Sequence, residues 1–96
     1  MKNSDLSGWR EQIDEIDQQI ITLLAKRHII SQKIGEIKSS TGQSVYDPQR
    51  EKEMLKQQRA LADKLQLEPE FITEIYQIIL QASKKVQTKV KGLAKL

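Results

Sequence analysis

Cysteine is absent from this 96-residue sequence, and glycine, proline and aromatic residues are scarce. Without cysteine the chain can form neither disulfides nor thiolate metal sites. Its single histidine, His28, cannot hold a metal ion alone. The abundant residues are Ile, Leu, Gln, Glu and Lys, which favour helices over strands. We therefore expect one all-α domain over residues 1–96 that uses no metal and no cofactor.

Long apolar runs are also missing. No window approaches the ~20 apolar residues of a membrane span, and the N-terminus has no apolar stretch of signal-peptide length. We expect a cytoplasmic protein without a membrane partner. The net charge of +3 is small, and most basic residues are interleaved with acidic ones. A basic helical dimer that binds nucleic acid would have a DNA affinity that depends strongly on salt, and this composition argues against it.

What the sequence does have is a long apolar repeat. The repeat steps alternate four and three residues, as in a coiled coil, through Trp9, Ile13, Ile16, Ile20, Leu23, Arg27, Ile30, Ile34 and Ile37. It predicts a helix over roughly residues 6–38, about 50 Å long. Ser4, Asp5 or Ser7 can cap its start, and residues 39–42 should end it.

Two shorter helices follow. Asp47 is a good N-cap and Pro48 suits the first helical position, so a second helix begins there. A third begins at Glu68-Pro69. The folded core should span about residues 6–88, and the Lys-rich residues 89–96 should form a frayed or mobile tail.

Two short helices cannot cover an apolar stripe of this length. An uncovered stripe is an association surface. We therefore expect a three-helix chain that forms an intertwined helical homodimer, with the two long helices packed on each other.

Arg27 interrupts the apolar stripe. It can extend its charge to solvent along its methylene stem, or pair with a carboxylate. Lys38, eleven residues on, lies on nearly the same face, and about 16 Å of helix separates the two. Both side chains are long, and the stripe has no acidic residue to neutralise them. The pair can converge on one small anion.

Other polar residues have a structural explanation as well as a functional one. Arg10 lies about 25 Å before Arg27, so it can reach the same ligand only from an antiparallel partner helix. Arg50 and Glu51 can be exposed first-turn charges behind the cap. Ser83 and Gln87 lie one turn apart on the third helix and can form the polar flank of that helix.

The sequence lacks a Cys-His or Ser-His-Asp set and a Gly-rich phosphate loop. It offers cations, an amide, a hydroxyl and a carboxylate. Such groups suit a reaction that needs shape and electrostatic stabilisation rather than a nucleophile.

The order and spacing of these residues resemble the all-helical chorismate mutase family. The resemblance covers residues ~6–88 and rests on segments 9–14 (WREQID), 24–27 (LAKR), 34–38 (IGEIK) and 47–51 (DPQRE), with Ser83-x-x-x-Gln87. It implies an intertwined dimer of three-helix chains with two sites. The implied activity is the [3,3] rearrangement of chorismate to prephenate, on the route to phenylalanine and tyrosine.

The resemblance also implies a role for each residue. Arg27 and the partner chain's Arg10 would bind the two substrate carboxylates. Lys38 and Gln87 would donate hydrogen bonds to the ether oxygen, so that the catalytic set is Arg27, Lys38 and Gln87. An amide donates at any ordinary pH, whereas the Glu of other members must be protonated.

The remaining roles concern the ring and the carboxylates. Glu51 and the backbone at Asp47 would hold the ring hydroxyl. Arg50 and Ser83 would assist carboxylate binding, Arg50 through water.

Two related functions compete with mutase activity. An isochorismate-pyruvate lyase has similar arginines but typically lacks the acidic pair that Asp47 and Glu51 match. A non-catalytic partner of a shikimate-pathway synthase would use the same fold for regulation.

Overall fold

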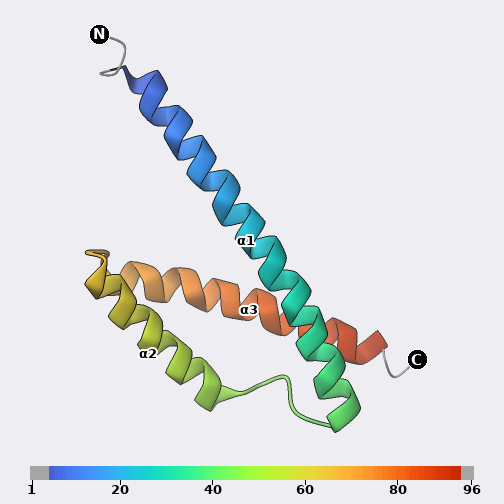
Figure 1. Cartoon of the computed structure of the whole chain (residues 1–96). Coiled ribbons are helices and arrows are strands. Elements are labelled where there is room, and N and C mark those ends of the chain that lie inside the picture. The colour runs from blue at the N-terminus through green and yellow to red at the C-terminus, as the bar shows by residue number, and fades with distance from the viewer. Residues whose placement is uncertain (1–4, 94–96) are drawn as a thin grey trace.

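The computed structural model describes residues 5–93, and these residues form three α-helices without any strand (Figure 1). α1 spans Leu6–Thr41, α2 spans Pro48–Lys64 and α3 spans Pro69–Leu93. The 36 residues of α1 make it about 54 Å long. The all-α fold with one long N-terminal helix, expected from the sequence, is confirmed.

The ends of α1 lie close to their predicted positions. Asp5 occupies the N-cap position, although its side chain makes no capping hydrogen bond to the described residues. Of the other two candidates, Ser7 lies inside the helix and Ser4 lies outside the described residues. Gly42 ends the helix in the left-handed conformation at φ 75°, which glycine adopts without a steric cost. The helix therefore stops inside the predicted stretch.

The Asp47-Pro48 signal does begin α2. The Asp47 carboxylate accepts a hydrogen bond from the backbone N–H of Arg50 at 3.1 Å, which satisfies one of the unpaired donors of the first turn. Residues 42–47 form the loop that carries the chain from α1 to this cap.

α2 ends in a tight reversal that leads into α3. The N–H of Leu67 donates to the carbonyl of Ala62 at 2.8 Å, and the N–H of Gln66 donates to that of Asp63 at 3.1 Å. Gln66 takes the left-handed conformation at φ 63°. This pair of hydrogen bonds defines a Schellman C-terminus, and Pro69 starts the next helix as predicted.

The end of α3 differs from the prediction. The helix continues to Leu93, beyond residue 88, after which a frayed tail was expected. Lys91 donates to the backbone carbonyl of Gln43 at 2.7 Å, which ties this last part of α3 to the α1–α2 loop. Local lysine content did not reveal this long-range contact. Residues 94–96 of the predicted tail lie outside the described residues.

α3 packs against both other helices, whereas within residues 5–93 the backbones of α1 and α2 stay apart and the two helices meet through a side-chain contact between Arg27 and Met54. The N-terminal half of α1 projects away from the pair formed by α2 and α3 (Figure 1). The chain is accordingly elongated, at 61 × 28 × 14 Å with a radius of gyration of 17.5 Å. A compact chain of this length would have a radius of about 12 Å.

Little apolar surface is buried within the single chain. Ala62 and Leu80 are the buried hydrophobic residues of the described chain. By contrast, the apolar stripe of α1 is open to solvent: Trp9 is 57% exposed, Ile13 56% and Leu23 61%. The sequence analysis predicted that the chain associates through this stripe, because it would otherwise be exposed. The homodimer itself stays a prediction.

Among the described residues, no helix has the length and apolar character needed to cross a membrane.

α1 and α3 lie in close contact at Gly35, which is buried. A Cβ atom placed there would lie 3.0 Å from the Cα of Gln87 and 3.1 Å from the Cβ of Val90. Two of the three nearest atoms belong to the backbone of Gln87, which cannot rotate away. Glycine thus lets the α3 backbone rest directly on α1.

We predict that Gly35→Ala destabilises the protein by up to about 2 kcal/mol. The substitution gains about 1 kcal/mol of helix propensity, but it forces α3 outward at a cost of about 1–3 kcal/mol. Thermal unfolding at fixed protein concentration measures the balance. Gly92→Ala is the control, because nothing lies within 4 Å of its Cβ position, and it should melt at or above the wild-type temperature. A Gly35→Ala protein as stable as this control would contradict the packing argument.

Candidate functional site

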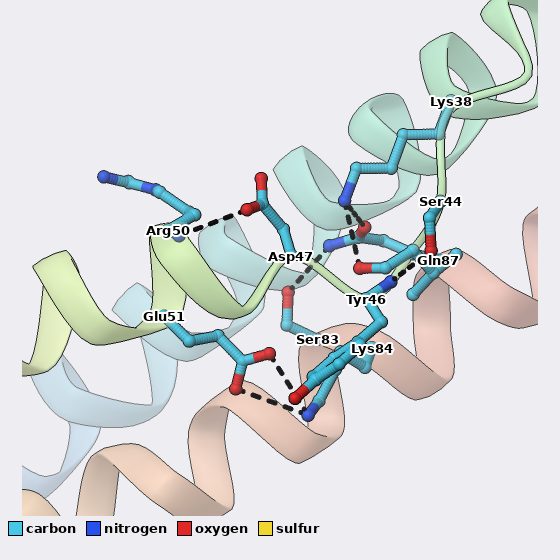
Figure 2. A network of polar contacts seen from close by, with 10 residues as sticks. Lys38, Ser44, Tyr46, Asp47, Arg50, Glu51, Ser83, Lys84 and Gln87 are labelled. Atoms are coloured by element: carbon cyan, nitrogen blue, oxygen red, sulfur yellow. Dashed lines mark hydrogen bonds and ion pairs between the residues drawn. The ribbon is translucent and has the colours of Figure 1, made fainter.

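A pocket of about 420 Å³ lies where α1 and α3 meet the start of α2. This volume suits a small organic ligand. Seven of the eight residues predicted from the sequence line it: Arg27, Lys38, Asp47, Arg50, Glu51, Ser83 and Gln87. Figure 2 shows six of these side chains, which come from all three helices and the loop before α2.

Lys38 and Gln87 are joined across the pocket wall. The Lys38 ammonium on α1 donates to Oε1 of Gln87 on α3 at 2.8 Å (Figure 2). An ammonium can only donate, so the carbonyl side of the amide must face it. The amide nitrogen consequently faces the other way, where Nε2 donates to Oγ of Ser83 at 3.3 Å. Gln87 is 6% exposed, so its carboxamide depends on these partners.

The Lys38 ammonium and the Gln87 amide each retain a hydrogen that no described residue accepts. The Lys38 ammonium has three hydrogens, of which one goes to Gln87 and one to the backbone carbonyl of Val45 at 3.2 Å. The Gln87 amide has two, of which one goes to Ser83. One donor on each side chain is therefore available to a ligand.

Arg27 lines the same pocket without a counter-ion. Within residues 5–93 no carboxylate lies within salt-bridge distance of its guanidinium. Its one side-chain hydrogen bond is a weak contact of 3.7 Å from Nη2 to the sulfur of Met54. Of the two structural explanations for this residue, pairing with a carboxylate is thus wrong. The half-buried charge faces the pocket instead.

Glu51 contributes the half-buried carboxylate of the pocket. Lys84, one residue beyond Ser83, lies 3.3 Å from both of its oxygens. The contact to Oε1 has hydrogen-bond geometry, whereas Oε2 is buried and accepts no hydrogen bond from the described residues. A buried acceptor without a donor is costly. A ligand hydroxyl placed at Oε2 would remove that cost.

Asp47 and Arg50 are more exposed than Glu51. The Asp47 carboxylate is engaged in capping α2, which is the structural explanation given for it above. The Arg50 guanidinium points away from the Lys38–Gln87 pair, although its side chain lines the pocket (Figure 2). In this conformation the Arg50 side chain does not contact a ligand held by Lys38 directly.

Arg10 is the predicted site residue that does not line this pocket. It lies on the exposed N-terminal half of α1, about 25 Å of helix before Arg27. As argued from the sequence, it cannot reach a ligand held by Arg27 within one chain.

Seven further residues line the pocket that were not predicted as site residues. Three of them, Ile30, Ile34 and Leu80, are apolar residues of the helix faces, and the other four are Ser31, Val45, Met54 and Lys84. A signal existed for two of these four. Ser31 follows Arg27 by one helical turn, and Lys84 falls between Leu80 and Gln87 with steps of four and three. Nothing local marks Val45 or Met54, because their place depends on how α2 folds back.

The pocket is lined by four cations, two carboxylates, an amide and two hydroxyls; of the carboxylates, Asp47 caps α2 and Glu51 is paired with Lys84. These groups can bind an anion that also carries a hydroxyl, and can direct hydrogen bonds at a chosen atom. Within residues 5–93, no three His, Asp or Glu side chains gather where they could hold a metal ion.

The sequence matches the family described as Chorismate mutase type II over residues 9–88. A chorismate mutase from Methanocaldococcus jannaschii is 33% identical over 82 residues, which cover 85% of this chain and 83% of that protein. A bifunctional chorismate mutase/prephenate dehydratase from Buchnera aphidicola is 36% identical over 88 residues, or 92% of this chain.

The chain is much shorter than several of these relatives. It spans 23% of that bifunctional protein and 21% of the T-protein of Enterobacter agglomerans. Among solved structures, a conserved hypothetical protein from Pyrococcus furiosus superposes with a TM-score of 0.71 at 39% identity. The match covers 88% of this chain and 96% of the other.

Proposed function

The chain belongs to the chorismate mutase type II family, and we propose that it converts chorismate to prephenate in the pocket between α1, α2 and α3. The observation that carries this proposal is the Lys38–Gln87 pair. The Lys38 ammonium on α1 donates to Oε1 of Gln87 on α3 at 2.8 Å, and each of the two side chains keeps one hydrogen for a ligand.

Chorismate carries two carboxylates, and the pocket is rich in cations. Arg27 presents a guanidinium that pairs with no carboxylate of residues 5–93. Such a half-buried cation gains most from a bidentate hydrogen-bonded anion. We assign one substrate carboxylate to Arg27 and assign Ser83 and Arg50 to supporting positions, Arg50 through water.

The ether oxygen of chorismate gains negative charge as its C–O bond breaks. The two remaining hydrogens of Lys38 and Gln87 are suited to that oxygen. A donor aimed at developing charge commonly contributes ~3–4 kcal/mol of transition-state stabilisation. The hydrogen bond between the two side chains fixes their positions beforehand, so little reorganisation is needed during reaction.

The ring hydroxyl of chorismate is assigned to Glu51 and the backbone at Asp47. The support for Glu51 is its buried Oε2, which lacks a hydrogen-bond donor. The bond changes of the rearrangement are intramolecular, so no base, acid or nucleophile is required. The protein needs to hold the enolpyruvyl arm over the ring, which removes an entropic part of the barrier.

The proposal includes a homodimer in which the partner's Arg10 completes the site. The exposed stripe of α1 supports it, because association would remove side chains such as Trp9 and Leu23 from water. A second, mostly apolar hollow of about 300 Å³ adjoins the pocket through the shared residues Arg27, Ser31 and Ser83.

We also propose that the protein is cytoplasmic, as expected from the sequence.

We predict that Arg27→Ala lowers kcat/KM for chorismate by about 10²-fold or more, because an unsatisfied substrate carboxylate costs several kcal/mol. The loss of chorismate absorbance measures the rate. Lys33→Ala removes an exposed cation from the same helix and should leave the rate unchanged. Equal rates for wild type and Arg27→Ala would refute the assignment of this pocket.

The same assay separates the related functions. Chorismate and isochorismate are supplied side by side, and prephenate and pyruvate are both measured. Release of pyruvate without prephenate would establish a lyase. A large rise in rate on adding a shikimate-pathway synthase would instead identify a regulatory partner.

We predict that wild-type activity is flat between about pH 6 and 8, because the Gln87 amide does not titrate in this range. In Gln87→Glu the side chain donates only when protonated. Its activity should be about 10²-fold below wild type at neutral pH and should rise as the pH falls. The measurement is kcat/KM across the pH range for both proteins. A wild-type rate that falls steeply over this range would count against Gln87 as the donor.

Mixing two inactive variants tests the shared site. In an isologous dimer, an Arg10→Ala chain and an Arg27→Ala chain regenerate one intact site per heterodimer. Random reassociation from denaturant should restore about a quarter of the wild-type sites and rate. Each variant refolded alone is the control. Failure of the mixture to exceed the two controls would show that Arg10 does not act across an interface.

A further inference from the structure

Ser31 is a buried hydroxyl that the roles described above leave unused. It is 3% exposed and lies one helical turn after Arg27. A serine inside a helix usually points to solvent or bonds back to the carbonyl four residues earlier. Here its Oγ lies instead 2.6 Å from Oγ of Ser83 on α3. This contact crosses between helices at the edge of the pocket.

The contact extends a chain of hydrogen bonds. Ser31 bonds to Ser83, Ser83 accepts from Nε2 of Gln87, and Oε1 of Gln87 accepts from Lys38. The chain begins and ends on α1 and passes through α3. Its outer end is fixed by the Lys38 ammonium, which can only donate.

Counting hydrogens decides the direction of the Ser31–Ser83 bond in the occupied site. Ser83 has one hydrogen and can accept two. It already accepts from Gln87. If Ser83 donated to Ser31, it would have no hydrogen left for an anion in the pocket. If Ser31 donates, Ser83 accepts twice and directs its own hydrogen to the anion.

We propose that Ser31 is a positioning residue of the site. It donates to Ser83, and thereby makes Ser83 at once an acceptor for the Gln87 amide and a donor to the anionic group of the substrate. Ser31 acts through Ser83 and does not touch the substrate. The proposal rests on the proposed mutase function for its kinetic test, but the underlying hydrogen-bond chain does not depend on that function.

A double-mutant cycle in kcat/KM tests the coupling. Ser31→Ala should lower kcat/KM about three- to tenfold, as expected for one lost hydrogen bond. Ser83→Ala should lower it at least as much. The double variant should be no slower than Ser83→Ala, because Ser31 then has nothing to act through. Losses that multiply would overturn the proposal.

Two further variants separate positioning from a general loss of structure. Ser40→Ala removes an exposed hydroxyl of α1 that bonds only to the nearby carbonyl of Ile37, and it should leave the rate unchanged. Ser31→Cys keeps the shape of the side chain but donates weakly, so its rate should lie between wild type and Ser31→Ala. A Cys variant as fast as wild type would contradict a role as donor.

The second readout is independent of catalysis. The side-chain amide signals of Gln87, identified by their loss in Gln87→Glu, are recorded by ¹H–¹⁵N NMR. Ser31→Ala should shift them and Ser40→Ala should not. Unchanged signals in Ser31→Ala would overturn the proposal whether or not the protein turns over chorismate. Absence of activity in the wild type, with the shift present, would refute the proposed function alone.

Discussion

The close approach of α1 and α3 at Gly35 is the constraint on which the pocket depends. The missing side chain lets the backbone of Gln87 rest on α1. At this separation Lys38 reaches the Gln87 carboxamide at 2.8 Å and Ser31 reaches Ser83 at 2.6 Å. Both contacts join α1 to α3, so a shift of either helix would break them together. The distance between α1 and α3 therefore determines both the packing of the two helices and the hydrogen bonds of the site.

The charges of the pocket are unevenly matched. Glu51 is paired with Lys84, whose ammonium also lies 5.4 Å from the centre of the Tyr46 ring. Lys38 is held by neutral acceptors, and Arg27 has no carboxylate partner among the described residues. The pocket therefore has an excess of positive charge before a ligand enters. Such an imbalance is unfavourable in an isolated fold but strengthens the binding of a small dianion.

The sequence was sufficient to predict the three helices and some of the residues that line the pocket. Helix starts at Pro48 and Pro69 followed from cap and proline chemistry, which acts within one turn. Arg27 and Lys38 emerged because one stripe of one helix carries both. The role of Gln87 came from resemblance, since its position on α3 is equally that of a solvated flank.

The features that the sequence did not predict are those that depend on contacts between helices. Ser31 and Lys84 have the right helical spacing, but spacing does not say which face of α3 meets α1. The extension of α3 to Leu93 is accompanied by the contact from Lys91 to Gln43, which lies on a distant loop. A composition rich in lysine suggested fraying there, because local propensity carries no information about that partner.

The cation excess of the pocket has a consequence for the end of the reaction cycle. The proposed rearrangement is intramolecular and neither adds nor removes a charged group, so prephenate would leave with the same two carboxylates that chorismate brought. Arg27 attracts both. The site can favour one over the other only through shape and the position of the ether oxygen. On the proposed function, accumulated product would compete for the pocket, and a following reaction that consumes it would relieve this competition.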